Sequence, residues 1–362
     1  MKKTCLYNEH EKLGAKFINF HEWLMPIQYT SIINEHNSVR ENVGMFDISH
    51  MGTFIISGKD AEHFINYVTL GNIINLPIGK AKYSMILNMH GGIKDDIIVY
   101  KYKTQEYMVV VNSGNISKVF TWLHEQYNYN KHIYTDVRIY NISNMICLIS
   151  IQGPLCIDKL QFLTKTNIKK IKYFSIVDIQ LNNLNSTFCK IARTGYTGED
   201  GFEIFISNKN AIQLWRKLLK LSIPPCGLGS RNTLRLESCM PLYGNELHEN
   251  IDPISLGFNS IINWDATFVG KDTLLNIKNN CSRKLIKFEC VLGIAREMDK
   301  VCIQDTIVGY VTSGAFSPTL KKAIGLALIN VDVISNNLTI KIHGRNRPIK
   351  VIDNKFYIKC TK

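Results

Sequence analysis

The chain has 362 residues, of which 45% are hydrophobic and 20% charged, an ordinary balance for a folded globular protein that argues against disorder or low complexity. Its net charge of +13 comes from scattered lysines and arginines rather than from a stripe, so we expect no nucleic-acid partner. No apolar run approaches the ~20 residues that cross a bilayer, so we expect no membrane association.

The first helix is predicted from Ser31 onward. Ser31 is a plausible N-cap, apolar residues recur after it at near-helical spacing, and Gly44 lies where a helix would end. The next segment places Asp47, Ser49 and His50 close together, which suggests a hydrolase triad. We reject that interpretation because triad members usually converge from distant segments, and a GxSxG elbow is absent.

Residues 53–133 are predicted to form an α+β unit. Strands and helices follow one another here, with a strand from 53, a helix to 68, a hairpin at 82–100, a strand at 106–112 and a helix at 116–127. A tight hairpin between helices favours antiparallel pairing over a doubly wound sheet. Asn112 closes its strand just before Ser113 and Gly114, where an amide is either a helix cap or a ligand contact.

The hairpin carries two adjacent acids, Asp95 and Asp96, just past Gly91 and Gly92. Acidic residues are depleted in strands and unfavourable to bury without partners. Because side chains alternate along a strand, we expect one carboxylate to face solvent and the other an interior or a pocket. A plain hairpin with two exposed acids is the competing interpretation.

The middle of the chain is predicted to hold a buried strand, a second hairpin and a helix, at 145–154, 187–206 and 211–221. Three acids lie in or beside the second hairpin's loop: Glu199, Asp200 and Glu203. A Pro- and Gly-rich loop follows, and a helix is expected from Asn232 onward. Arg231 beside that helix start is either an anion site or a solvated surface arginine. The lone GLG there is too weak a signal for dinucleotide binding.

The segment after about residue 280 is rich in short alternating runs separated by Gly, Asn and Pro. This pattern predicts an all-β domain, a small barrel or a jelly roll, with its boundary near 275–282.

The cysteines and the N-terminus indicate the compartment. No two of the ten cysteines form a CxxC pair, so no zinc or other metal site is predicted. Cys147 and Cys290 lie inside apolar runs, where a free thiol behaves as a small hydrophobe. The first residues lack the apolar segment of a signal peptide and the composition of a transit peptide. We therefore expect a cytoplasmic protein.

Nine segments in order resemble the glycine cleavage system T-protein (aminomethyltransferase) family. They run from about residue 13 to 320 and read LGAKFINFHEWLMP, GMFDISHMG, GGIKDDIIVY, VVVNSGN, QGP, RTGYTGEDGFEI, GLGSRNTLRLE, LYGNEL and TSGAFSPTL. The resemblance implies a multidomain α+β folate-binding fold. Its domains would be a discontinuous first domain (1–52, about 134–155 and 222–278), an α+β antiparallel-sheet domain (about 53–133 and 156–221) and a C-terminal β barrel or jelly roll (about 279–362).

The resemblance implies a reaction and its participants. A one-carbon unit passes from the aminomethyl-lipoyl arm of the H-protein to tetrahydrofolate, a co-substrate, and ammonia and methylenetetrahydrofolate are released. Asp96 matches the family's key acid, which can orient the amine nucleophile and stabilise an iminium-like centre. Glu199 and Arg231 are expected to contact the folate, and Met51, Tyr83 and Asn112 to line its pocket.

Three departures from the family pattern are visible. Glu22 stands where the family has glycine, Asn232 where it has aspartate, and Ser238-Cys239 where it has alanine-glycine. An alternative is a non-enzymatic folate-binding protein of iron-sulfur cluster assembly, which shares this fold. Its KGCYxGQE signature is replaced here by RTGYTGEDG, which favours the transferase.

Overall fold

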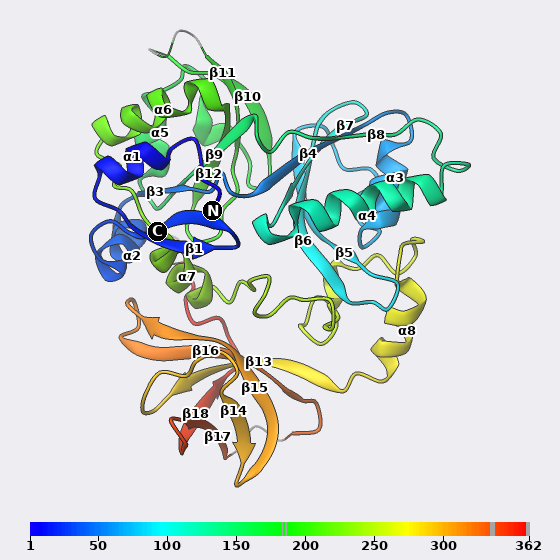
Figure 1. Ribbon diagram of the computed structural model, residues 1–362, viewed down its shortest axis with the longest axis vertical. Coiled ribbons are helices and arrows are strands. Elements are labelled where there is room, and N and C mark those ends of the chain that lie inside the picture. The colour runs from blue at the N-terminus through cyan, green and yellow to red at the C-terminus, as the bar shows by residue number, and fades with distance from the viewer. Residues whose placement is uncertain (183, 185–186, 334–336, 360–362) are drawn as a thin grey trace.

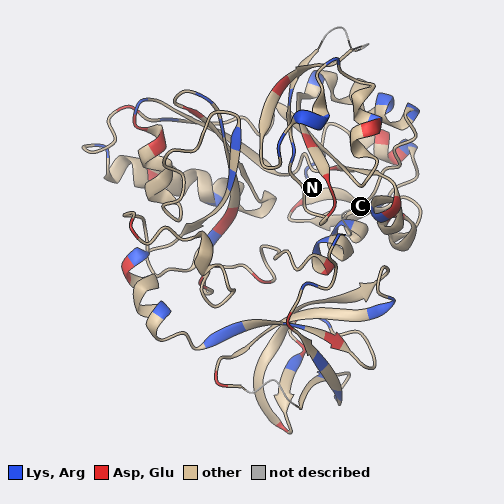
Figure 2. Ribbon diagram, turned by 180° about the vertical axis from the view of Figure 1, so that it is seen from behind, with Lys and Arg blue, Asp and Glu red and all other residues tan. Residues whose placement is uncertain are grey.

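Two five-stranded sheets and a closed barrel organise the chain. The computed structural model describes residues 1–182, 184, 187–333 and 337–359. Two sheets with their helices lie side by side, and a barrel lies beyond them (Figure 1). Lysines and arginines occur in all three parts and are interspersed with acids (Figure 2). No helix among the described residues is long and apolar enough to cross a membrane.

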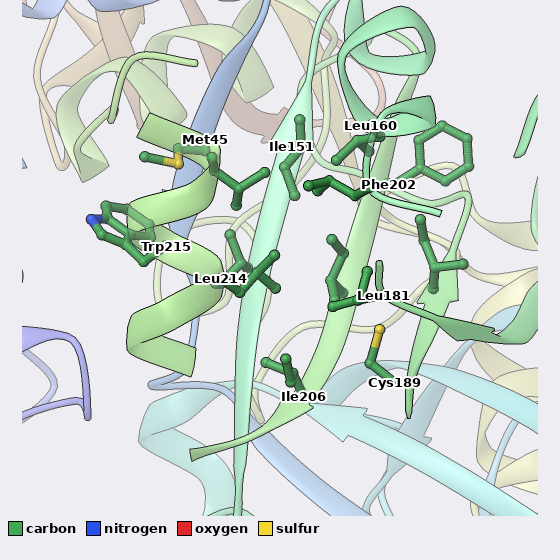
Figure 3. Close-up of a cluster of buried hydrophobic side chains, with 14 of the residues drawn as sticks. Met45, Ile151, Leu160, Leu181, Cys189, Phe202, Ile206, Leu214 and Trp215 are labelled. Carbon is green, nitrogen blue, oxygen red and sulfur yellow. The ribbon is translucent and has the colours of Figure 1, made fainter. Parts of the chain in front are cut away.

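The first sheet is antiparallel and has the order β10-β11-β12-β9-β3. Its strands are β3 (Gly44–Asp47), β9 (Ile146–Gln152), β10 (Ile176–Gln180), β11 (Phe188–Ala192) and β12 (Gly201–Ser207). The neighbouring helices are α1 (Tyr7–Lys12), α5 (Cys156–Gln161) and α6 (Asn208–Lys220), with the short 3₁₀ helix η2 (Ile168–Lys170). Leu214 and Trp215 of α6 pack with the apolar face of this sheet in one fully buried cluster (Figure 3). Burial of that helix face attaches α6 to the sheet.

The second sheet is also antiparallel and has the order β5-β6-β7-β4-β8. Its strands are β4 (Gly52–Ser57), β5 (Lys80–Leu87), β6 (Ile93–Lys103), β7 (Glu106–Val111) and β8 (Arg138–Asn141). Helices α3 (Ala61–Val68) and α4 (Ile116–Tyr129) bury Phe64 and Trp122 against it, and the 3₁₀ helix η1 (Ser113–Asn115) precedes α4. The predicted α+β unit with antiparallel pairing is confirmed.

The C-terminal strands close into a barrel in the order β13-β16-β15-β14-β17-β18. They are β13 (Arg283–Cys290), β14 (Lys300–Ile303), β15 (Thr306–Ser317), β16 (Lys322–Asn330), β17 (Leu338–Ile342) and β18 (Arg345–Ile352). Each of these six strands therefore has a neighbouring strand on both sides. The barrel predicted from residue 280 onward is therefore confirmed.

Helix α7 (Leu228–Glu237) lies between the sheets and the barrel (Figure 1). It contacts α2 (Ile32–Glu41), the strand β2 (Trp23–Gln28) and barrel strands β15 and β16. It begins four residues before the predicted start at Asn232. The reason is a tertiary cap: the backbone N–H of Gly227 donates to Glu35 Oε2 at 2.8 Å. Remaining elements are α8 (Lys271–Asn279) and the 3₁₀ helix η3 (Asn259–Ile261).

The hairpin β1 (Lys16–Phe20) and β2 (Trp23–Gln28) turns through residues in left-handed conformation. Glu22 has φ +67°, a region that favours glycine. The glycine that the family carries at this position therefore has a conformational reason. The downstream helix α2 begins as predicted, because Ser31 accepts a hydrogen bond from the backbone of Asn34.

The domain boundaries stay a prediction, but the observed sheets combine the strands differently from one of the predicted domains. Residues 156–221 were expected to join 53–133. Instead, the strands at 176–207 pair with β9 and β3 in the first sheet. Pairing between β12 and β9 involves residues far apart in the chain, and local sequence patterns carry no information on such partners.

Candidate functional site

A cavity of about 1340 Å³ opens where the two sheets, α7 and the barrel meet. Its wall is mostly apolar, with a few polar groups contributed by different elements, among them Asp96 of β6, Arg231 of α7 and Ser313 of β15. Such a wall, apolar with convergent polar groups, is typical of a small-molecule site.

The structure brings five of the six predicted site residues to this cavity: Met51, Tyr83, Asp96, Asn112 and Arg231. Asp96 lies at the centre of a small polar group. Its Oδ2 accepts a hydrogen bond from the Tyr83 hydroxyl at 3.1 Å, and its Oδ1 accepts one from Asn112 Nδ2 at 2.7 Å. Of the two roles considered for the Asn112 side chain, the helix cap is absent, because the amide makes no capping hydrogen bond although Asn112 stands at the N-cap position of η1.

The side chains of Asp95 and Asp96 do not divide between solvent and interior as we expected. Asp96 lines the cavity, and the side chain of Asp95 is fully buried in the protein. Asp95 is retained inside because three N–H groups donate to it, two from Asn112 and one from Asn115. Burial raises the pKa of both carboxyls above their usual range, and the closeness of the two acids adds to this shift.

The turn before the two acids requires glycine. Gly91 has φ +77°, and a Cβ on Gly92 would lie 1.8 Å from the carbonyl oxygen of Glu249. The close approach of the loop that carries Glu249 therefore holds this end of β6 in place.

Arg231 lies in the first turn of α7 with its guanidinium 4.7 Å from the ring centroid of Tyr196. Its Nη1 is buried and has no hydrogen-bond partner among the described residues. Burial lowers the pKa of Arg231. The solvated-surface interpretation is therefore wrong. Asn232, where the family has aspartate, accepts a hydrogen bond from Arg235 rather than from Arg231.

Glu199 does not lie in the cavity wall. Its buried carboxylate accepts a hydrogen bond from Arg40 Nη1 at 3.0 Å, which makes a buried ion pair. Glu203, four residues later on β12, lines the cavity instead and accepts hydrogen bonds from Thr194 at 2.7 Å and Tyr100 at 3.4 Å. The alternation along β12 could have found it, because Phe202 faces the core and Glu203 therefore faces the other side.

His50 is a cavity residue that the sequence interpretation did not assign. It is 2% exposed, and its Nδ1 has no hydrogen-bond partner among the described residues. Burial lowers its pKa to about 4, so the imidazole is neutral near pH 7. The rejected hydrolase triad is not assembled, because the Ser49 hydroxyl donates to Asp47 and Asp47 is bonded to His10 instead.

Comparisons with known proteins agree with this architecture. Residues 6–266 match the GCVT N-terminal domain model, and residues 283–357 match the glycine cleavage T-protein C-terminal barrel domain model. The aminomethyltransferase of Thermoanaerobacter pseudethanolicus is 41% identical over 100% of this chain and 99% of its own length. That of Caldanaerobacter subterraneus subsp. tengcongensis is 42% identical over 100% of this chain and 97% of its own.

A solved structure shares the whole fold. The crystal structure of the glycine cleavage system aminomethyltransferase T from Bartonella henselae superimposes with a TM-score of 0.90 at 28% identity, covering 98% of both chains. Family models over both parts of the chain, full-length relatives and this structure all agree. The chain therefore belongs to the glycine cleavage T-protein family of aminomethyltransferases.

Proposed function

We propose that the cavity binds tetrahydrofolate and receives the aminomethyl-lipoyl arm of a lipoylated H-protein. Two carbon–nitrogen bonds form from the transferred methylene carbon to the folate. The carbon–nitrogen bond to the amino group and the carbon–sulfur bond to the lipoyl arm break. The two protons that leave the folate amines end on ammonia and on the lipoyl thiol, so the reaction needs no oxidant or reductant.

The observation that carries this proposal is Asp96 in the cavity wall, bonded to Tyr83 and Asn112. A carboxylate in a poorly hydrated wall interacts strongly with a secondary amine or a developing cation. Tyr83 and Asn112 restrict its rotation, so that little reorganisation is needed during the reaction. In this proposal Asp96 takes a proton from the attacking amine and stabilises positive charge on the transferred carbon.

The size of the cavity supports two substrates rather than one. Its volume of about 1340 Å³ exceeds the roughly 300–1,000 Å³ that commonly holds one small ligand. A folate and the end of a lipoyl arm would share this space, with the reacting carbon beside Asp96.

We assign the folate contacts from the geometry of the wall. Glu203 takes the role that was expected of Glu199, because its carboxylate lies in the wall and suits the amino and ring N–H groups of a pterin. Arg231 offers Nη1, a donor without a partner among the residues that the structure describes, to an acceptor on the folate. Met51 and Tyr83 supply apolar contact.

The pathway role follows from the same reaction. Together with an H-protein, the chain would serve glycine catabolism and supply one-carbon units, in the cytoplasm. The relatives reported above support the transferase rather than the alternative of a folate-binding factor for iron-sulfur assembly.

The test is release of ammonia and methylenetetrahydrofolate from aminomethylated H-protein, with tetrahydrofolate present or omitted. Folate-stimulated release of both products in equal amounts is expected. Folate binding without any turnover would overturn the transferase and revive the non-enzymatic alternative.

A further inference from the structure

Asp95 is a second carboxylate beside the reacting group, and its surroundings are unusual. The side chain is fully buried, and both of its oxygens accept hydrogen bonds from N–H groups. Oδ1 accepts from Asn112 Nδ2 at 2.8 Å and from Asn115 Nδ2 at 2.6 Å, and Oδ2 accepts from the backbone N–H of Asn112 at 2.9 Å. The same Asn112 amide reaches Asp96 Oδ1 at 2.7 Å, so it bridges the two acids.

These contacts decide which acid holds a proton. A protonated carboxyl needs an acceptor for its O–H, and the described partners of Asp95 are all donors. Asp95 is therefore the ionised member of the pair. Asp96 Oδ2 faces the cavity and the Tyr83 hydroxyl, and a hydroxyl can accept as well as donate. An added proton belongs on Asp96 Oδ2.

The surrounding charges do not neutralise the pair. Among the described residues no ion pair joins Asp95 or Asp96 to a cation. The titratable groups that face the two acids are three phenols: Tyr83 on β5, Tyr196 in the loop before β12 and Tyr243 in the loop after α7. Burial raises the pKa of each phenol and so keeps it neutral. The nearest cations lie beyond these phenols. Arg231 stacks on Tyr196, and the charge of Arg235 also acts on Tyr196. Lys118 donates a hydrogen bond to Tyr243 and forms an ion pair with Glu249.

We propose that Asp95 is a positioning residue whose fixed negative charge makes Asp96 take up a proton near neutral pH, so that Asp96 both accepts and returns a proton during aminomethyl transfer. Two carboxylates this close and this buried resist being ionised together. As a carboxylate, Asp96 takes the proton of the attacking folate amine; as an acid, it returns that proton to the departing amino group. The inference rests on the proposed transferase reaction.

The first experiment compares kcat/KM against pH in the wild type and in Asp95→Asn, with Glu249→Gln as a control that removes a nearby charge outside the cavity wall. Without the Asp95 charge, Asp96 should lose its proton more readily, and the acid limb should move down by about one pH unit or more. Folate affinity should change less than about threefold, since Asp95 does not line the cavity. If kcat/KM fell equally at every pH and the acid limb of the profile did not move, Asp95 would have only a structural role and the proposal would be overturned.

The second experiment needs neither turnover nor a variant of Asp95. Carbon-13 NMR of the wild type labelled at aspartate carboxyls should show one carboxyl that titrates near pH 6. That signal should disappear in Asp96→Asn. Absence of any aspartate titrating above pH 5, or survival of the signal in Asp96→Asn, would refute the proposal. Failure of turnover alone would instead count against the transferase, because this titration does not depend on it.

Discussion

At the scale of single residues, the proposed reaction relies most on the carboxylate of Asp96, which lines the cavity. Asp96→Asn keeps the size of the side chain and removes the charge, so the fold should be unchanged while turnover falls by about 10²- to 10⁴-fold. The measurement is product formation from aminomethylated H-protein at saturating tetrahydrofolate. Asp265→Asn, in an exposed loop, is the matched control and should turn over normally. Near-normal rates in Asp96→Asn would remove this carboxylate from the mechanism.

Glu203 and Glu199 make a matched pair, because both lie in or next to one strand but only Glu203 lines the cavity. Glu203→Gln should weaken tetrahydrofolate binding by about 10- to 100-fold, the loss of a charged hydrogen bond. Glu199→Gln should leave that affinity nearly unchanged and lower the free energy of unfolding, because it breaks the buried pair with Arg40. Calorimetric titration and urea unfolding of both variants separate the two roles. The reverse pattern would restore Glu199 as the folate contact.

At the scale of elements, Asp47 of β3 connects the N-terminal helix to the first sheet. Burial opposes its charge, but hydrogen bonds from His10, Ser49 and Thr4 hold its pKa at about 2. The folded-state pKa is thus below the unfolded value of about 3.9. The carboxylate therefore contributes stability above pH 4, roughly 2–3 kcal/mol, which is lost as the pH falls toward 2.

Asp47→Asn should lower the free energy of unfolding by that amount at pH 7, and the difference from the wild type should shrink at pH 3. Urea unfolding at both pH values is the measurement. Asp178→Asn, whose ion pair with Lys190 lies on the surface, should change stability by less than about 1 kcal/mol. A deficit that stays constant with pH would mean that packing, and not charge, explains the effect of Asp47.

In the turn between β1 and β2, by contrast, a substitution should stabilise the fold. Because Glu22 has φ +67°, Glu22→Gly should raise the free energy of unfolding by up to about 1 kcal/mol. Glu41→Gly, at the end of α2, is the control and should destabilise by roughly 0.5–1 kcal/mol. Both values come from thermal or urea unfolding. A destabilised Glu22→Gly would show that the exposed ion pair between Lys2 and Glu22 outweighs the backbone strain.

At the scale of the whole molecule, the net charge of +13 predicts that opposite charges would attract the proposed partner, an acidic H-protein. Salt screens such attraction, so the affinity for H-protein should fall by roughly tenfold between low and moderately high salt. Titration calorimetry or surface binding measures this, with osmotically matched sucrose as the control. An affinity that is flat with salt would mean that charge does not guide docking.

The sequence by itself determined the elements and the reaction. Local patterns were enough for the hairpin at 82–100, the helix at 116–127 and the C-terminal barrel strands, because alternation and capping act over a few residues. The ordered motifs were enough for the family, and they predicted Asp96 as its key acid. Tertiary structure alone decided which strands share a sheet, where α7 begins, and which glutamate lines the cavity, since each depends on contacts between distant segments. Asp95 shows the reason most clearly: Asn112 and Asn115, 17 and 20 residues away, supply the hydrogen bonds that allow its carboxyl group to be buried beside Asp96.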